Sequence, residues 1–200
     1  AAVGYHWRAM DTIPEVKGFL KKNPARMVLA AWHDSTPPPQ WWRHQDTSGG
    51  QIVEQATHLF DLARYLLGEA SLVESLAQKN PRPAYPDADV TDVSAALVRF
   101  PKGVPGVFSA TCDLSGPVEI YVKLICDGAM VTITQQGTVF DLESQKVEKR
   151  LSSDPFLTEN RAFLKAIQQN DPTLLYSSYE DALKTHALCH DVLENYQKKM

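Results

Sequence analysis

The second half of the chain carries a series of turn signals that stand too close together for anything but hairpins. Short connections join antiparallel strands only, because a parallel crossover needs a dozen residues or more. The signals are Lys102-Gly103, Ser115-Gly116-Pro117, Asp127-Gly128 and Gln136-Gly137, and the strand-like runs between them are 90–100, 105–114, 117–126, 129–134, 137–142 and 145–151. The sequence therefore predicts an antiparallel sheet here, with one more strand before it at 71–78.

Within these runs apolar and polar side chains alternate. In 117–126 one row is Val118, Ile120, Val122 and Leu124, which we assign to the core, and the other is Glu119, Tyr121, Lys123 and Ile125. Val131 and Ile133 continue the apolar row in one neighbouring run, as do Phe108, Ala110 and Cys112 in another. The outward face then mixes hydroxyls, an aromatic ring and a few aliphatic groups, as a wet sheet face or a protein interface would.

Helical spacing marks the remaining segments. Helices are expected at 12–22, 50–68, 156–169 and 178–198, and an additional strand at 26–35. Of the two closing helices, the first has the apolar face Phe163, Leu164 and Ile167, and the second has Ala182, Leu183, Ala187, Val192, Leu193 and Tyr196 facing inward. The loop between 36 and 50 contains three prolines, which exclude regular structure. The expected fold is α+β: an open, predominantly antiparallel sheet with helices packed on one face.

Composition excludes several classes of function. The chain of 200 residues has a net charge of −4 and a pI near 5.9, so it offers no basic footprint for nucleic acid or an anionic membrane. No apolar run approaches the roughly 20 residues of a membrane span, and no secretory or transit segment is recognisable. The three cysteines, Cys112, Cys126 and Cys189, are far apart and form no C-x-x-C. Free thiols of this kind favour a reducing compartment, the cytoplasm.

One helical stretch, "GGQIVEQATHLFDLARYLLGE" at 49–69, concentrates ionisable groups. On a regular helix Glu54, His58, Asp61 and Tyr65 lie within roughly 40° of one another. Such a stripe is either a solvated surface or the wall of a site. In the second interpretation Glu54, one turn before His58, orients the imidazole and raises its pKa, as general acid/base catalysis requires.

The order of several segments resembles a known family. "SGGQIVEQATHLFDLARYLLGE" is similar to the helix that opens the C-terminal domain of the glucose–fructose oxidoreductase and inositol dehydrogenase (Gfo/Idh/MocA) family. "VGYHWR" at 3–8 looks like the exit from that family's nucleotide domain, and "DPFLTENRAFLKAIQQNDP" and "SSYEDALKTHALCHDVLE" look like its closing helices. The resemblance covers essentially the whole chain and rests on the order of loose motifs.

The resemblance implies a division of the chain and a reaction. Residues 1–8 would be the exit from an N-terminal Rossmann domain, and residues 9–200 the substrate-binding and oligomerisation domain. Members of the family are NAD(P)-dependent oxidoreductases of sugars, inositols and similar polyhydroxy compounds. NAD or NADP would bind upstream of Ala1, because the chain contains no G-x-G-x-x-G. No cofactor is therefore expected on this chain alone, which by itself would be inactive.

The family pattern assigns roles to individual residues. His58 matches the histidine that helps proton transfer at the substrate hydroxyl. Glu54 stands where the family often has an aspartate, one methylene shorter, and Asp61 matches a supporting aspartate. The expected site is thus catalytic His58 and Glu54 with Asp61 in support.

Further candidates for the substrate site lie outside this helix. Trp41 and Trp42 could stack on a sugar ring, and Arg43 could donate two hydrogen bonds to hydroxyl groups. Alternatively, all three side chains could simply anchor the loop. Tyr5 and Arg8 stand at the domain junction, where Arg8 could reach the cleft or form a structural ion pair. His186 and His190 lie one turn apart, but no third ligand has a natural place, so no metal site is predicted.

Two hypotheses of different classes remain open. In the first the chain is the substrate domain of an oxidoreductase, paired through its sheet face into a dimer or tetramer, with no nucleic-acid or membrane partner. In the second it is a non-enzymatic module that uses the same sheet for interaction or oligomerisation. A glycine-rich nucleotide turn upstream of Ala1 would decide for the first.

Overall fold

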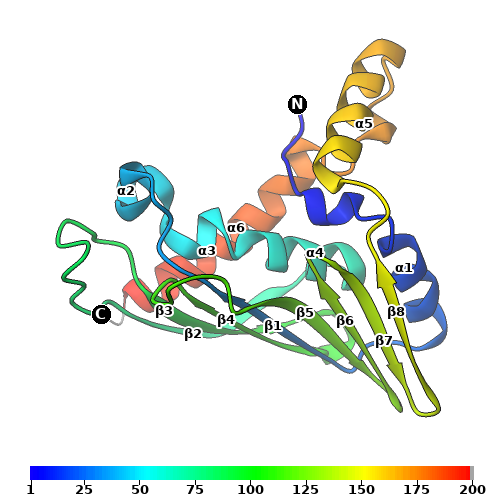
Figure 1. Cartoon of the computed structure of the whole chain (residues 1–200), viewed down its shortest axis with the longest axis horizontal. Helices are drawn as coiled ribbons and strands as arrows, with labels where there is room; N and C mark the ends of the chain where they lie inside the picture. The colour runs from blue at the N-terminus through cyan, green and yellow to red at the C-terminus, as the bar shows by residue number, and fades with distance from the viewer. Residues whose placement is uncertain (199–200) are drawn as a thin grey trace.

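An eight-stranded open sheet forms one layer of the molecule (Figure 1). The structure is a computed structural model that describes residues 1–198. In spatial order the strands are β2 (Ser71–Gln78), β3 (Val93–Arg99), β4 (Pro105–Thr111), β1 (Met27–His33), β5 (Glu119–Cys126), β6 (Ala129–Thr134), β7 (Gly137–Leu142) and β8 (Gln145–Arg150). The strand series predicted from the turn signals is confirmed, with ends shifted by a few residues.

One pair of strands is parallel. β1 runs parallel to β4, with Trp32 opposite Ala110, and antiparallel to β5, with Trp32 opposite Ile120. The other neighbours are antiparallel. The parallel pair is possible because several helices and the strands β2 and β3 separate β1 from β4 in sequence. The sheet is therefore predominantly antiparallel, as predicted.

The sheet buries one of its faces. Val122, Leu124, Val131 and Ile133 have no exposed surface, and Phe108 and Ala110 are nearly as deep. These are the rows that alternation assigned to the core. The prediction that Val118 belongs to the buried row is wrong. Val118 lies before β5 begins and is 71% exposed. Its backbone N–H donates to the carbonyl of His33, and the regular alternation starts only after it.

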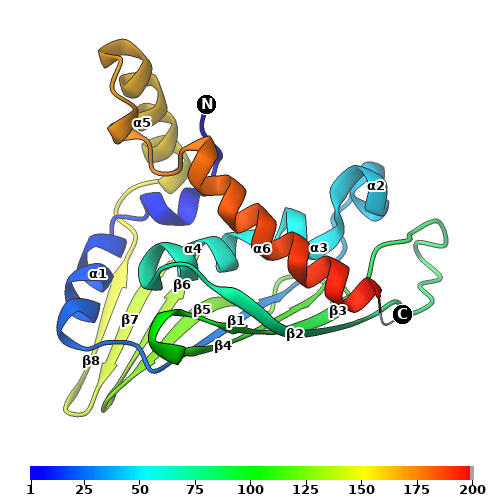
Figure 2. The ribbon, with the colours of Figure 1, turned by 180° about the vertical axis from the view of Figure 1, so that it is seen from behind.

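Three helices lie on the buried face. α1 (Ile13–Lys22) lies beside the β7–β8 end, where Phe19 contacts Phe140 edge to face at 5.5 Å. α4 (Thr57–Leu67) lies over the middle, and α6 (Tyr179–Gln197) runs along β2, in front of α4 in the view of Figure 2. α6 buries Leu188 and Cys189, whereas Leu183 and Ala187, expected to face inward, are exposed.

The helix expected over 50–68 is interrupted. α3 (Gly50–Glu54) and α4 are separated at Gln55 and Ala56. The carbonyl of Gln51 accepts hydrogen bonds from the backbone N–H groups of both Gln55, at 3.0 Å, and Ala56, at 2.8 Å. This widened turn inserts an extra residue and changes the helical phase. Glu54 and His58 therefore do not share the regular stripe that the sequence predicted.

The proline-containing loop is more ordered than expected. It contains a 3₁₀ turn, η2 (Gln40–Arg43), and a single helical turn, α2 (Gln45–Ser48). The turn ends at Gly49, whose φ of 72° suits glycine and where a Cβ would approach Val53 to 2.8 Å. Prolines at 37–39 precede the helical residues, so they do not interrupt them.

α5 (Pro155–Gln169) departs most from the expected layer. It projects away from the sheet (Figures 1 and 2) and packs chiefly on the short turns η1 (His6–Ala9) and η4 (Pro172–Leu174). Its predicted apolar face, Phe163, Leu164 and Ile167, is exposed. The prediction that this helix covers the sheet is wrong. η3 (Pro101–Gly103) completes the elements, and no helix within residues 1–198 is long and apolar enough to cross a membrane.

Candidate functional site

His58 lies in the first turn of α4, among three aromatic rings from two other parts of the chain. The ring of His6 lies 4.8 Å from it, that of Tyr5 5.7 Å and that of Trp32 6.0 Å, centroid to centroid. Tyr5 and His6 come from the N-terminal segment and Trp32 from the end of β1. The sequence brings them together because the N-terminal segment crosses the start of α4, which lies above β1.

The imidazole of His58 is held in its neutral form. Burial, and to a smaller extent the neighbouring His6, lowers the pKa of His58 from 6.5 to about 3. Its Nδ1 atom is buried and has no hydrogen-bond partner among residues 1–198. A neutral imidazole with an unused nitrogen can make one further hydrogen bond there, as donor or acceptor according to its tautomer, while its lowered pKa makes it a weak base.

Glu54 does not serve His58 in the way the sequence suggested. Its Oε2 accepts a hydrogen bond from Nε1 of Trp42 at 2.6 Å. Because the helix changes phase between the two residues, Glu54 is not among the groups that shift the pKa of His58. The expectation that Glu54 raises this pKa is wrong, and the observed contact gives Glu54 the part of fixing the Trp42 ring.

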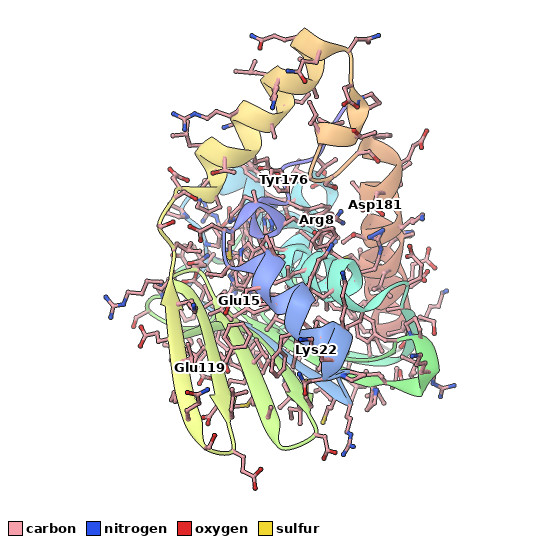
Figure 3. All side chains as sticks on the ribbon, turned by 90° about the vertical axis from the view of Figure 1, so that its right-hand side faces the viewer. Arg8, Glu15, Lys22, Glu119, Tyr176 and Asp181 are labelled. Atoms are coloured by element: carbon pink, nitrogen blue, oxygen red, sulfur yellow. The ribbon has the colours of Figure 1, made fainter. Side chains whose placement is uncertain are left out.

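Arg8 and Asp61 form the polar centre below the aromatic cluster. Nε of Arg8 donates to Asp61 Oδ2 at 2.7 Å, and its Nη2 donates to Oδ1 at 2.5 Å. Nη1 of Arg8 forms an ion pair with Asp181 Oδ2 at 2.6 Å and donates a hydrogen bond to the carbonyl of Tyr176 at 3.1 Å. Figure 3 shows Arg8, Tyr176 and Asp181 beneath α5. Thr185 also donates to Asp61, at 2.8 Å. Of the two possibilities for Arg8, the structure contains the ion pair.

The remaining predicted substrate residues occupy different positions. Tyr5 is buried, and its hydroxyl bonds Thr57 Oγ1 at 3.0 Å. Trp41 is half exposed, while Trp42 is buried. Arg43 pairs with Asp87 at 3.2 Å and lies over the Tyr85 ring. Only Tyr5 of these contacts His58, and the substrate-binding roles stay predictions.

Three residues near the site were not singled out in the sequence. His6 lies between His58 and Phe156 of α5: its ring contacts that of His58 edge to face and stacks on that of Phe156, with 3.9 Å between the latter two centroids. Glu159, one turn further along α5, has a buried Oε1 without a partner among residues 1–198. Burial, with help from Asp61 and against the opposing effect of Arg8, raises the pKa of Glu159 to about 7. The sequence offered one sign of His6, its place in the "YHWR" segment at the expected domain junction. Phe156 and Glu159 could not be assigned to the site without knowing the position of α5.

Further polar and ionisable groups lie outside the predicted set. A polar cavity of about 590 Å³ includes Arg82, Asn80 and Asp113 in its lining, and none of the predicted site residues. Cys189 is fully buried near Thr57, and burial raises the pKa of its thiol to about 12. Within residues 1–198 no group of three potential ligands is arranged to hold a metal ion.

The comparison with known proteins identifies the family. A family model described as the GFO/IDH/MocA C-terminal domain matches residues 24–132, more than half of the chain. The chain belongs to the GFO/IDH/MocA C-terminal domain family. The family resemblance read from the sequence is thus confirmed, and so is its α+β fold class.

Relatives of this GFO/IDH/MocA domain are longer than the chain itself. The protein UNK4.17 of Schizosaccharomyces pombe, described as uncharacterized, is 25% identical over 224 residues, which are 96% of this chain and 54% of that protein. The chain thus spans about half the length of this curated relative.

Solved structures share the fold at lower identity. A 3-ketoreductase from Actinomadura kijaniata in complex with NADP and TDP-benzene superposes with a TM-score of 0.81 and 16% identity, covering 98% of this chain and 62% of that one. A levoglucosan dehydrogenase in complex with NADH and levoglucosan gives 0.79 and 18%, with 98% and 64% covered. At these identities the GFO/IDH/MocA fold is what the likeness establishes.

Proposed function

We propose that the chain is the substrate domain of an NAD(P)-dependent oxidoreductase that transfers a hydride to or from a sugar, an inositol or a similar polyhydroxy compound. The observation that carries this proposal is the neutral His58 in its aromatic enclosure, with Nδ1 unused among residues 1–198. Family membership and neighbours that hold NADP or NADH support it. Residues 1–8 would then be the exit from an N-terminal Rossmann domain, and residues 9–200 the substrate-binding and oligomerisation domain.

His58 would handle the proton of the reacting hydroxyl. During oxidation the substrate O–H proton moves to the imidazole, while the C–H bond at the same carbon breaks. The nicotinamide, when bound, supplies the acceptor for that hydride. His58 has a neutral ring but no carboxylate partner, so it is suited to pass the proton on and not to keep it.

The neighbouring residues would shape the site. Glu54 would hold Trp42 in place, and the half-exposed Trp41 would offer an indole face to the C–H groups of a sugar ring. The Arg8–Asp61 pair would fix the N-terminal segment so that Tyr5 and His6 stay against His58.

The chain would leave the cofactor phosphates to the preceding domain. Its sequence contains no G-x-G-x-x-G, and a phosphate-cradling turn at a helix N-terminus is what such a cofactor needs. Buried free thiols at all three cysteines fit a reducing compartment, and we propose a cytoplasmic protein.

The outward sheet face would pair two copies into a dimer, or into a tetramer. It presents Tyr121 with Lys123 at 3.9 Å from its ring, beside Thr132. Further along, Leu76, Leu97 and Val107 are exposed on the same face. A stable two-fold contact would bury at least roughly 1,000 Å². The exposed apolar side chains of this face are also the observation that keeps the non-enzymatic interaction module as the alternative function.

Calorimetric titration with NAD and NADP tests the proposal. A polypeptide that includes the region upstream of Ala1 should bind one of the two cofactors at micromolar affinity, whereas residues 1–200 should bind neither. Binding of similar strength to residues 1–200 alone would contradict the division of labour. A complete polypeptide that binds neither cofactor would favour the interaction module.

A further inference from the structure

The polar cavity of about 590 Å³ lies between the β2–β3 loop, residues 79–92, and the residues that follow β1 and β4. The loop projects beyond the sheet at the same end of the molecule as α2 (Figures 1 and 2). A cavity of this volume is in the range of small-molecule sites. We call it the loop cavity, and its lining includes Thr36, Asn80, Arg82, Tyr85, Cys112 and Asp113.

Arg82 has a hydrogen-bonding group that the described chain does not use. Its Nη1 donates to Thr36 Oγ1 at 2.9 Å and to Cys112 Sγ at 3.1 Å, and these two bonds fix the plane of the guanidinium. Its Nη2 is buried and has no hydrogen-bond partner among residues 1–198. A buried donor without an acceptor costs free energy, and more so when it is charged. This nitrogen therefore needs an acceptor oxygen, which a molecule in the loop cavity would supply.

The loop that carries Arg82 is restricted by its own sequence. Asn80, Arg82 and Tyr85 each stand directly before a proline, and the residue before a proline is held in the extended region. Asn80 is also anchored at its base, because its backbone N–H, at 2.7 Å, and its side-chain amide, at 3.1 Å, both donate to the buried Asp92. A wall that is already ordered loses little conformational entropy when a ligand binds.

The charges around Arg82 disfavour an anion as the ligand. The single guanidinium faces two carboxylates, the buried Asp92 and the exposed Asp113 at the rim of the cavity. Burial, and after it the charge of Asp92, raises the pKa of Asp113, while Arg82 acts in the opposite direction. A third negative charge would be repelled by this pair. A hydroxyl group avoids the conflict, because it accepts from a guanidinium and donates to a carboxylate.

We propose that the loop cavity binds a neutral polyhydroxy ring, a sugar or a cyclitol. One hydroxyl would accept a hydrogen bond from Nη2 of Arg82, and another would donate to Asp113. The C–H groups of the ring would lie against Tyr85 and Leu114, which also line the cavity. This site is separate from the one around His58 and does not rest on the proposed function, since it requires no proton transfer and no cofactor.

A ligand in the loop cavity would also steady the neighbouring segment. The N–H of Asp89, near the end of the loop, donates to the carbonyl of Arg43 at 3.0 Å. Trp42 packs in one buried cluster with Val90 of the loop and Cys112 of the cavity wall. A ring that bridges the loop and the strand ends would therefore restrain the position of Trp42.

Titration of residues 1–200 with myo-inositol and with glucose, followed by NMR, tests the inference. At least one of the two should bind saturably, with a Kd of about 10 mM or below. The amide signals of Thr36, Tyr85 and Ser115 should shift, because these residues line the cavity. The amide of Asp89 should exchange more slowly with solvent when the ligand is bound.

Two variants locate the ligand and define its class. Arg82→Lys keeps the charge but loses the planar donor group, and it should weaken binding at least about tenfold. Asp113→Asn, at the exposed rim, should weaken the binding of a neutral polyol but strengthen the binding of an anion, and it decides the question if Arg82→Lys fails to fold. The matched controls Arg150→Lys and Asp141→Asn, at exposed positions of β8 and β7, should leave binding unchanged.

Three results would overturn the inference. The absence of saturable binding by either polyol would mean that the cavity holds water only. Binding of inorganic phosphate in place of the polyols, tighter in Asp113→Asn, would make it an anion site. Polyol binding that His58→Asn abolishes and Arg82→Lys leaves intact would place the ligand at His58. A complete polypeptide that binds polyols through Arg82 but no nicotinamide cofactor would refute the proposed function and leave this site standing.

Discussion

Arg8 and Asp61 form a buried bidentate ion pair that joins the N-terminal segment to α4. The two donor–acceptor distances are 2.7 and 2.5 Å, and the Asp61 side chain has no exposed surface. The pair lies one turn from His58, and it holds the segment that brings Tyr5 and His6 to the candidate site. It therefore contributes to the geometry of the site as well as to the stability of the fold.

Removing the negative charge of this pair should be costly. Asp61→Asn leaves the Arg8 guanidinium buried with only the partly exposed Asp181 to balance it. We expect a loss of about 3–5 kcal/mol in the free energy of unfolding, measured by urea denaturation. Asp127→Asn, in the exposed pair with Arg26, should cost less than about 1 kcal/mol. A similar small effect for Asp61→Asn would show that the pair is not needed.

Glu54 should have no electrostatic hold on His58. Because Glu54 bonds Trp42, the variant Glu54→Gln should leave the titration of His58 unchanged. In the NMR spectrum the His58 ring signals of both proteins should stay in the neutral position between about pH 5 and 8. A His58 that titrates near pH 6 in the wild type, and lower in Glu54→Gln, would restore the pairing suggested by the sequence.

Glu159 should make stability depend on pH. Its pKa of about 7 in the folded protein lies above the ordinary 4.5. Between these values the folded state keeps a proton that the unfolded state releases, so stability falls as pH rises through this window. The variant Glu159→Gln has no ionisable group at this position. It should therefore be more stable than the wild type at about pH 8 and equally stable at about pH 4.

Thermal unfolding at the two pH values measures this effect of Glu159. Glu180→Gln, at an exposed carboxylate of α6, serves as the control and should show no such pH-dependent difference. A gain in stability for Glu159→Gln that is the same at both pH values would mean that packing, and not ionisation, is responsible.

The outward sheet face should mediate self-association. Light scattering on residues 1–200 at high micromolar concentration should show a dimer or a larger assembly, because the mixed apolar face is broad enough for a two-fold contact. Tyr121→Glu and Thr132→Lys, which place charges on this face, should shift the equilibrium to the monomer. Glu143→Lys, in the exposed β7–β8 turn, should leave it unchanged. A monomeric wild type would rule out this interface.

The sequence predicted what local signals determine. Turns such as Asp127-Gly128 fix hairpins by their length alone, and the alternation of Val131 and Ile133 fixes which face is buried. The position of α5 has no such signal, because an amphipathic stripe says that a helix packs and not on what. Phe163 and Leu164 therefore looked like core residues, although in this chain they are exposed.

The candidate site could be predicted only in part, because most of its contacts are also made by residues that are distant in sequence. His58 stood out by its motif, but its environment is made by residues far away in sequence, Tyr5, His6 and Trp32. The widened turn at Gln51, a single backbone irregularity, separated Glu54 from the stripe that regular helical spacing had drawn. No pattern of side chains marks such a turn.

The turnover of His58→Asn in the complete polypeptide tests the central claim most directly. Asparagine keeps a polar side chain at this position but cannot shuttle the proton, and the fold should stay intact. With polyol or sugar substrates and the preferred nicotinamide cofactor, turnover should fall by roughly 10² or more, while His190→Asn, on the exposed face of α6, should retain normal activity. A folded His58→Asn protein with near-normal turnover would contradict the assignment of His58 as the proton-transfer residue.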